Sequence, residues 1–171
     1  MSRYILSCCS TADMDESFYK ERDVHYICFS FLMDNILYKD DLGKSMSLDE
    51  FYKRMADGAT PTTSQVNAEE FVEYFEEFLK EGKDILHISL SSGISGVFNS
   101  ANIAKQQLSE KYPDRKIIGI FLPNTYSRTE ALFDDFVKSL KLFDKAYVMD
   151  ISCDRERRED YPNINSQKLV D

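Results

Sequence analysis

Stretches typical of β-strands alternate with stretches typical of α-helices along this chain. Runs rich in apolar and β-branched residues predict strands at 4–9, 24–33, 84–89, 116–121 and 145–151. Between them lie helical patterns, the clearest at 67–80 and 129–142, where apolar residues recur every three or four positions. Strands separated by helices build right-handed crossovers and a mostly parallel sheet. We therefore predict an α/β fold, a three-layer sandwich with a mostly parallel, about five-stranded Rossmann-like or flavodoxin-like sheet.

A turn signal interrupts the second of these apolar runs. Asp34-Asn35 has apolar residues on both sides, which favours a hairpin turn into a short strand at 36–38. We expect this hairpin to form an irregular edge of the main sheet. At 171 residues the chain can bury a core of its own, and its length favours a single domain over residues 1–171.

Charge and composition exclude several classes of function. The formal net charge of −9 lacks the basic footprint of a nucleic-acid-binding protein. No apolar run approaches the ~20 residues of a membrane span, and the N-terminus lacks a signal-peptide pattern, so we expect a cytoplasmic protein without a membrane span. The cysteines show no CxxC spacing and are expected to be buried free thiols rather than a metal or disulfide framework: Cys8, Cys9, Cys28 and Cys153.

The turn that follows the strand at 84–89 is rich in serine and glycine. It reads Leu90-Ser91-Ser92-Gly93-Ile94-Ser95-Gly96-Val97, and a helix is expected over 98–108. A strand-to-helix turn offers free backbone N–H groups and the positive end of a helix dipole, which suit an anion. Serines in such a turn also act as plain helix caps. The segment alone therefore leaves anion binding and simple capping as alternatives.

A second polar segment, Thr63-Ser64-Gln65, precedes the helix that begins near Asn67. Together with the Ser-Ser-Gly-Ile-Ser-Gly turn, it resembles motifs of the DegV family of bacterial fatty-acid-binding proteins. The resemblance extends from the N-terminus to about residue 117. It also includes Cys9-Ser10-Thr11-Ala12-Asp13, Tyr38-Lys39-Asp40-Asp41 and Phe51-Tyr52.

This resemblance implies a site for an acyl carboxylate. In the family, the Thr of Thr-Ser-Gln and the Ser of Ser-Gly hold the carboxylate, and these positions are Thr63 and Ser95 here. The candidate ligand-binding residues are Thr63, Ser95, Ser92, Gly93 and Gly96. The chain departs from the family at Val97, where a Thr is usual. It also lacks the acid before the first Ser of the N-terminal motif, where Cys8 and Cys9 stand.

From Lys116 onward the sequence resembles a second family. The stretch from Ile117 to Thr129, which ends Tyr-Ser-Arg-Thr, is similar to the C-terminal domain of the Mur ligases, most closely the UDP-N-acetylmuramate–L-alanine ligases. Leu122 and Asn124 replace the Gln and His of that motif, which counts against ligase chemistry. We expect the helix at 129–142 to pack against the first half of the chain through Phe133, Phe136 and Leu140.

Two resemblances in one chain predict a chimera joined near residues 110–118. Its single α/β domain would combine a DegV-like part, from 1 to about 115, with a Mur-ligase-like part, from about 116 to 171. Our main interpretation is an engineered chimeric protein without catalytic activity that retains at most a remnant fatty-acid carboxylate site. The alternatives are a functional fatty-acid-binding protein of the DegV type and an inactive fragment of a peptidoglycan-precursor ligase.

Catalytic signals are sparse. His25 and His87 fall within expected strands, where a hydrogen-bonded core histidine is commoner than a catalytic one. The sequence contains no Gly-x-x-x-x-Gly-Lys-[Ser/Thr] motif to cradle ATP phosphates. We expect no enzymatic activity, no cofactor and no metal. The expected partners are a fatty acid or another carboxylate, and a second copy of the chain bound through apolar surface that a missing second domain leaves exposed.

Overall fold

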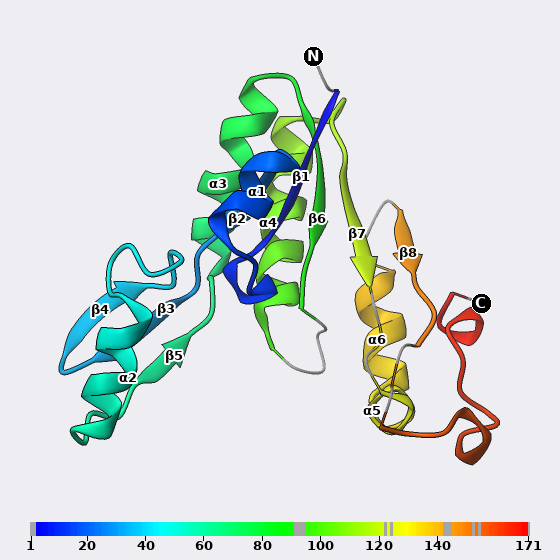
Figure 1. The fold of residues 1–171 in the computed structure, drawn as a ribbon. Coiled ribbons are helices and arrows are strands. Elements are labelled where there is room, and N and C mark those ends of the chain that lie inside the picture. The colour runs from blue at the N-terminus through cyan, green and yellow to red at the C-terminus, as the bar shows by residue number, and fades with distance from the viewer. Residues whose placement is uncertain are drawn as a thin grey trace.

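The fold is built around a parallel sheet. The structure is a computed structural model and describes residues 3–90, 95–121, 123, 125–141, 145–151, 153 and 155–170. The sheet contains β1 (Tyr4–Cys9), β2 (Val24–Ile27), β6 (Asp84–Ile88), β7 (Ile117–Phe121) and β8 (Ala146–Val148). Their order is β2-β1-β6-β7-β8, and all neighbours are parallel (Figure 1). The predicted α/β fold with a parallel sheet is confirmed, and the sheet continues across residues 110–118 because β7 pairs with β6.

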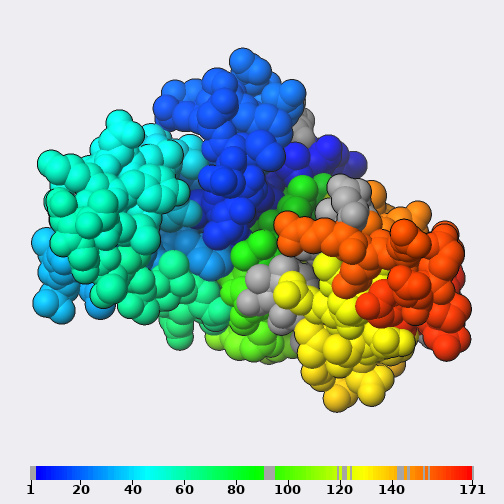
Figure 2. Space-filling view, turned by 60° about the horizontal axis from the view of Figure 1, so that its bottom comes forward, coloured from blue at the N-terminus to red at the C-terminus, as the bar shows by residue number. Residues whose placement is uncertain are grey.

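A second, antiparallel sheet lies beside the first. It consists of β3 (Ser30–Met33), β4 (Ile36–Lys39) and β5 (Thr62–Ser64) in the order β4-β3-β5. The predicted turn is present, because Asp34 and Asn35 both have left-handed backbones with φ of 53° and 63°. The expectation that this hairpin would form an edge of the main sheet is wrong. Figure 2 shows residues 30–65 as a lobe at one end of the molecule, opposite residues 125–170.

The predicted strand at 24–33 divides at Cys28 and Phe29 for a hydrogen-bonding reason. The Phe29 N–H donates to Ser10 Oγ at 3.0 Å, and the Phe29 carbonyl accepts from Asp40 N at 2.9 Å. These partners come from outside the main sheet, so the backbone leaves β2 and enters β3. The short strand β5, which carries Thr63, was not predicted.

Helices connect and cover the strands. They are α1 (Glu16–Glu21), α2 (Leu48–Ala56), α3 (Ala68–Lys80), α4 (Val97–Lys111), α5 (Tyr126–Ala131) and α6 (Phe133–Leu140), with 3-10 turns η1 (Ser10–Ala12), η2 (Arg158–Asp160) and η3 (Gln167–Leu169). The helix expected at 129–142 is two helices, because Thr125 caps an earlier start and Leu132 leaves the helical backbone with φ of −117° and ψ of 20°.

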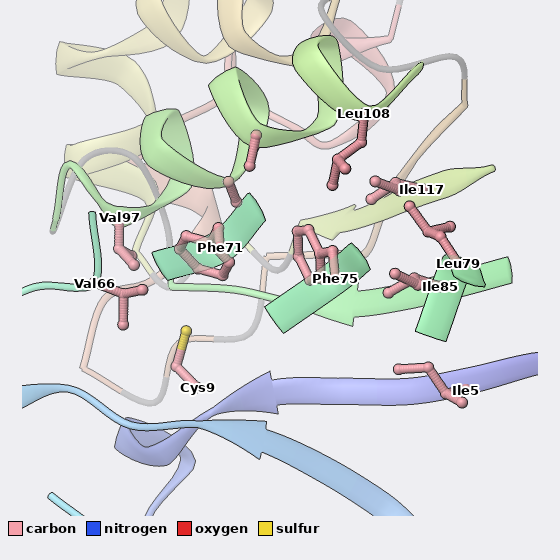
Figure 3. Packing of buried hydrophobic residues seen from close by; sticks show 12 residues of the cluster. Ile5, Cys9, Val66, Phe71, Phe75, Leu79, Ile85, Val97, Leu108 and Ile117 are labelled. Carbon is pink, nitrogen blue, oxygen red and sulfur yellow. The ribbon is translucent and has the colours of Figure 1, made fainter. Parts of the chain in front are cut away.

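The main core lies between the sheet and the α3–α4 pair. Phe71, Phe75 and Leu79 of α3 pack with residues of α4, and together they cover Ile5, Ile85 and Ile117 of the strands (Figure 3). A smaller cluster surrounds Phe136, Leu140 and Leu169. Its described members, Leu132, Phe133, Val137 and Val148 included, all come from the C-terminal part of the chain. Within the described residues α6 packs on β8 and η3, and the expected packing of Phe133, Phe136 and Leu140 against the first half stays a prediction.

Among the described residues, α1 covers the opposite face of the sheet near β2. His25 contacts Phe78 of α3, whereas its neighbour Tyr26 points to the other face and contacts Tyr19 of α1, with ring centres 4.6 Å apart. The residues that pair across the strands on this second face are, in order, Tyr26, Cys8, Ile88, Ile120 and Tyr147. Ile88 and Tyr147 are 43% and 45% exposed. We call Ile88, Ile120 and Tyr147 the open face.

Candidate functional site

The serine- and glycine-rich turn lies where β6 ends and α4 begins. Ser92 and Gly93, two of the predicted site residues, lie outside the described residues, as do Ser91 and Ile94. Ser95 is half-buried and its Oγ accepts the N–H of Val97 at 3.2 Å. Ser95 precedes the N-cap residue Gly96, and its hydroxyl satisfies one backbone donor of the first helical turn.

Gln65 joins this turn to the Thr63-Ser64-Gln65 segment. Ser95 Oγ donates to Gln65 Oε1 at 3.1 Å, and Gln65 Nε2 donates to Ser100 Oγ at 3.5 Å. Gly96 lies directly against the same amide. The structure thus brings together two motifs that are separate in the sequence. Gln65 was not among the predicted site residues, although its place in the Thr-Ser-Gln motif was the available signal.

Thr63 lies at a pocket between the small sheet and α2. It is exposed and pairs with Phe31 across β5 and β3. The pocket has a volume of ≈ 250 Å³. Most of its lining side chains are apolar: Phe29, Phe31, Met46, Leu48, Phe51, Tyr52 and Pro61. Ser95 and Gly96 do not line it. Thr63 is therefore the predicted site residue that faces an apolar space.

Charged and polar side chains also line this pocket, Lys39 and Asp40 among them. Ser10 Oγ donates to Asp40 Oδ2 at 2.7 Å while it accepts the N–H of Phe29. Thr11 and Asp40 both line the pocket.

A buried polar cluster lies beneath the sheet and away from this pocket. His87 Nδ1 is 3.0 Å from Ser7 Oγ, which in turn lies 2.8 Å from the Tyr74 hydroxyl. Burial lowers the pKa of His87 to about 3, so its ring is neutral at pH 7. Burial also raises the pKa of Cys9 to about 12, which keeps the thiol protonated and unreactive. This cluster is structural, as expected for a histidine within a strand.

The remaining sequence expectations concern cysteines, metals and membranes. Cys8 and Cys9 are buried, Cys28 and Cys153 are half-buried, and all four are free thiols. The described residues contain no group of three or more side chains that could hold a metal ion. Within the same residues, no helix has the length and apolarity needed to cross a bilayer.

A parallel sheet whose strands are connected by helices defines the class of open-sheet α/β proteins. Within that class, the chain belongs to the DegV family. The family model described as "Uncharacterised protein, DegV family" matches residues 9–129.

Several relatives and solved structures are similar to this chain. A DegV domain-containing protein of Clostridium perfringens is 39% identical over 117 residues, which cover 68% of this chain and 40% of that protein. A stearic-acid-binding protein from Eubacterium ventriosum is 30% identical with a TM-score of 0.63, covering 81% of this chain and 47% of that one. The fatty-acid-binding DegV of Bacillus subtilis is 28% identical with a TM-score of 0.56, covering 63% and 38%. The chain spans about two fifths of the length of the curated relatives it matches.

These comparisons correct the prediction of an engineered, inactive chimera. The family match crosses the expected junction at 110–118 and ends at 129, so it includes the Tyr126-Ser127-Arg128-Thr129 motif. The Eubacterium structure covers 81% of the chain, which also exceeds the part expected to be DegV-like. The resemblance to Mur ligases finds no support. A strand followed by a polar turn and a helix is common to many α/β proteins, so this local similarity does not indicate membership of the Mur ligase family.

Proposed function

We propose that this chain binds fatty acids and holds their carboxylate at Thr63 and Ser95. The observation that carries the proposal is the Gln65 contact, which joins the strand bearing Thr63 to the turn bearing Ser95. Similar proteins of known structure are described as binding stearic acid or fatty acids, which supports the choice of ligand. The chain spans only part of those relatives, so the ligand of this chain is part of the proposal.

The strand order supports the location of the site. In the order β2-β1-β6-β7-β8 the direction of winding reverses between β1 and β6, as it does in a flavodoxin-like sheet. Ligands of such sheets bind beyond the carboxyl ends of the strands at this reversal. Ser10 follows β1, and Ser95 lies in the connection after β6. We propose that Ser92, Gly93 and Gly96 complete the carboxylate site with backbone N–H groups at the start of α4.

The pocket beside Thr63 would hold the first part of the acyl chain. Burial of a methylene group contributes ~0.8 kcal/mol, so the apolar walls formed by Phe31, Phe51 and Leu48 would supply most of the affinity. Pockets that enclose drug-sized ligands are usually about 300–1,000 Å³, and this one is ≈ 250 Å³. A long chain would therefore extend beyond it, and binding would be weaker than in a fully enclosed site.

Calorimetric titration with palmitate tests the proposed function. The unmodified chain is expected to bind, and Thr63→Ala or Ser95→Ala should weaken binding by roughly 10- to 100-fold, because each removes a hydrogen bond to a charged group, typically ~1.5–3 kcal/mol. Thr62→Ala is the matched control, since Thr62 precedes Thr63 on β5 and its side chain points to the other face of that sheet. No detectable binding by the unmodified chain would refute the proposal.

A further inference from the structure

Gln65 lies between the two segments that carry the proposed carboxylate site. Its side chain extends from the end of β5 to the start of α4, and there its amide meets three residues. Oε1 accepts the Ser95 hydroxyl proton at 3.1 Å, Nε2 points to Ser100 Oγ at 3.5 Å, and Gly96 packs against the amide plane.

Gly96 is shaped to accept this amide. A Cβ atom at position 96 would lie 3.0 Å from both Nε2 and Oε1 of Gln65, closer than side chains normally approach. The φ of Gly96 is −70°, a backbone that any residue adopts. The missing side chain therefore serves close packing against Gln65 and not the conformation of the turn.

The contact also decides where the Ser95 hydroxyl points. A serine hydroxyl has one proton to donate, and Ser95 gives it to Gln65 Oε1 while its oxygen accepts the Val97 N–H. A ligand carboxylate must compete with Gln65 for that proton. It must also approach an amide that is neutral, where an acid in the same place would repel it.

We infer that Gln65 is the positioning and head-group-selecting residue of this site. It holds the Thr63 strand against the Ser95 turn, orients the Ser95 hydroxyl, and admits an anionic head group because its own side chain is uncharged. This inference rests on the proposed function. It adds a specificity role for a residue that does not need to touch the acyl chain.

The test compares dodecanoate with dodecanol in calorimetric titrations of the full 171-residue chain. Gln65→Glu keeps the size of the side chain and an acceptor for Ser95, but places a negative charge beside the head group. It should weaken dodecanoate binding at least about tenfold at pH 7.5 and change dodecanol binding by less than about threefold. Gln106→Glu is the control, because it makes the same change at an exposed position farther along α4. Circular dichroism melting curves verify that each variant is folded.

A second pair of variants tests the packing against Gly96. Gly96→Ala should weaken dodecanoate binding, and the double variant Gln65→Ala/Gly96→Ala should bind no more weakly than Gln65→Ala alone, because the three atoms nearest to the added methyl group belong to the Gln65 amide. If the losses of dodecanoate affinity in Gln65→Ala and Gly96→Ala add up in the double variant, the proposed packing of Gln65 against Gly96 is wrong.

The outcomes separate the inference from the proposed function. If the unmodified chain binds dodecanoate but Gln65→Glu weakens both probes equally, Gln65 supports only the fold and the selectivity role is wrong. If the unmodified chain binds no dodecanoate, the proposed function fails and the role of Gln65 fails with it.

Discussion

At the scale of single residues, His87 shows how burial sets protonation. Its ring packs against Phe71 and Phe75, each with its ring centre 5.3 Å away, and is hydrogen-bonded to Ser7. The folded protein keeps the ring neutral down to a pKa of about 3, against an ordinary value of 6.5. As the pH falls, His87 takes up a proton at a higher pH in the unfolded chain than in the folded protein. Stability contributed by this group is therefore present above pH 6.5 and is lost progressively between about 6.5 and 3.

We expect His87→Gln to reduce the dependence of stability on pH in that range. A glutamine can still bond to Ser7 but cannot take up a proton. Urea unfolding midpoints measured from pH 7 to pH 4 should fall less steeply for the variant than for the unmodified chain. His25→Gln, the same change at a half-exposed position of β2, is the control. If the unfolding midpoint of His87→Gln falls with pH as steeply as that of the unmodified chain, the buried ring is not the source of the pH dependence.

At the scale of elements, Glu76 ties α3 to α4. Its carboxylate accepts from Lys80 Nζ at 2.8 Å, from the Tyr112 hydroxyl at 3.2 Å, and from Lys111 Nζ. The hydrogen bond from Lys111 is the main cause that lowers the pKa of Glu76 to about 2, and Lys80 adds to it. Stability from this carboxylate is present above its ordinary pKa of 4.5 and is lost as the pH falls toward about 2.

We expect Glu76→Gln to lower the melting temperature at pH 7, and the difference from the unmodified chain to disappear near pH 2. The interaction lies at the surface, so 1 M NaCl should also reduce the difference. Glu73→Gln, on the exposed side of the same helix, is expected to have little effect. Melting curves at the two pH values and two salt concentrations measure this, and an equal loss at pH 7 and pH 2 would contradict the role of the charge.

At the scale of the whole molecule, the open face is a partly exposed apolar strip of the parallel sheet, with Ile88 and Tyr147 43% and 45% exposed. Ile88, Ile120 and Tyr147 lie side by side across three strands, and such sheets are usually covered on both faces. We expect the chain to self-associate through this face, because large exposed apolar patches favour association. Sedimentation velocity should show a concentration-dependent dimer that Ile88→Lys weakens and Leu37→Lys, on the separate small sheet, does not. A single monomer species at high concentration would contradict the expectation.

Local signals predicted much of the fold correctly. The apolar stripe at 67–80 forms α3 as expected, and the apolar run at 116–121 is a parallel strand. The separation of β2 from β3 was not predictable, because it depends on partners of Phe29 that come from Ser10 and Asp40.

The sequence by itself determined the alternation of strands and helices, the turn at Asp34-Asn35, and the motifs that carry Thr63 and Ser95. These features follow from local preferences of the backbone and from the spacing of apolar residues. Only the tertiary structure decided that two sheets form instead of one and that Gln65 connects the candidate site. The reason is that Gln65 and Ser95 are 30 residues apart, and their contact depends on how β5 and α4 pack, which no local pattern encodes.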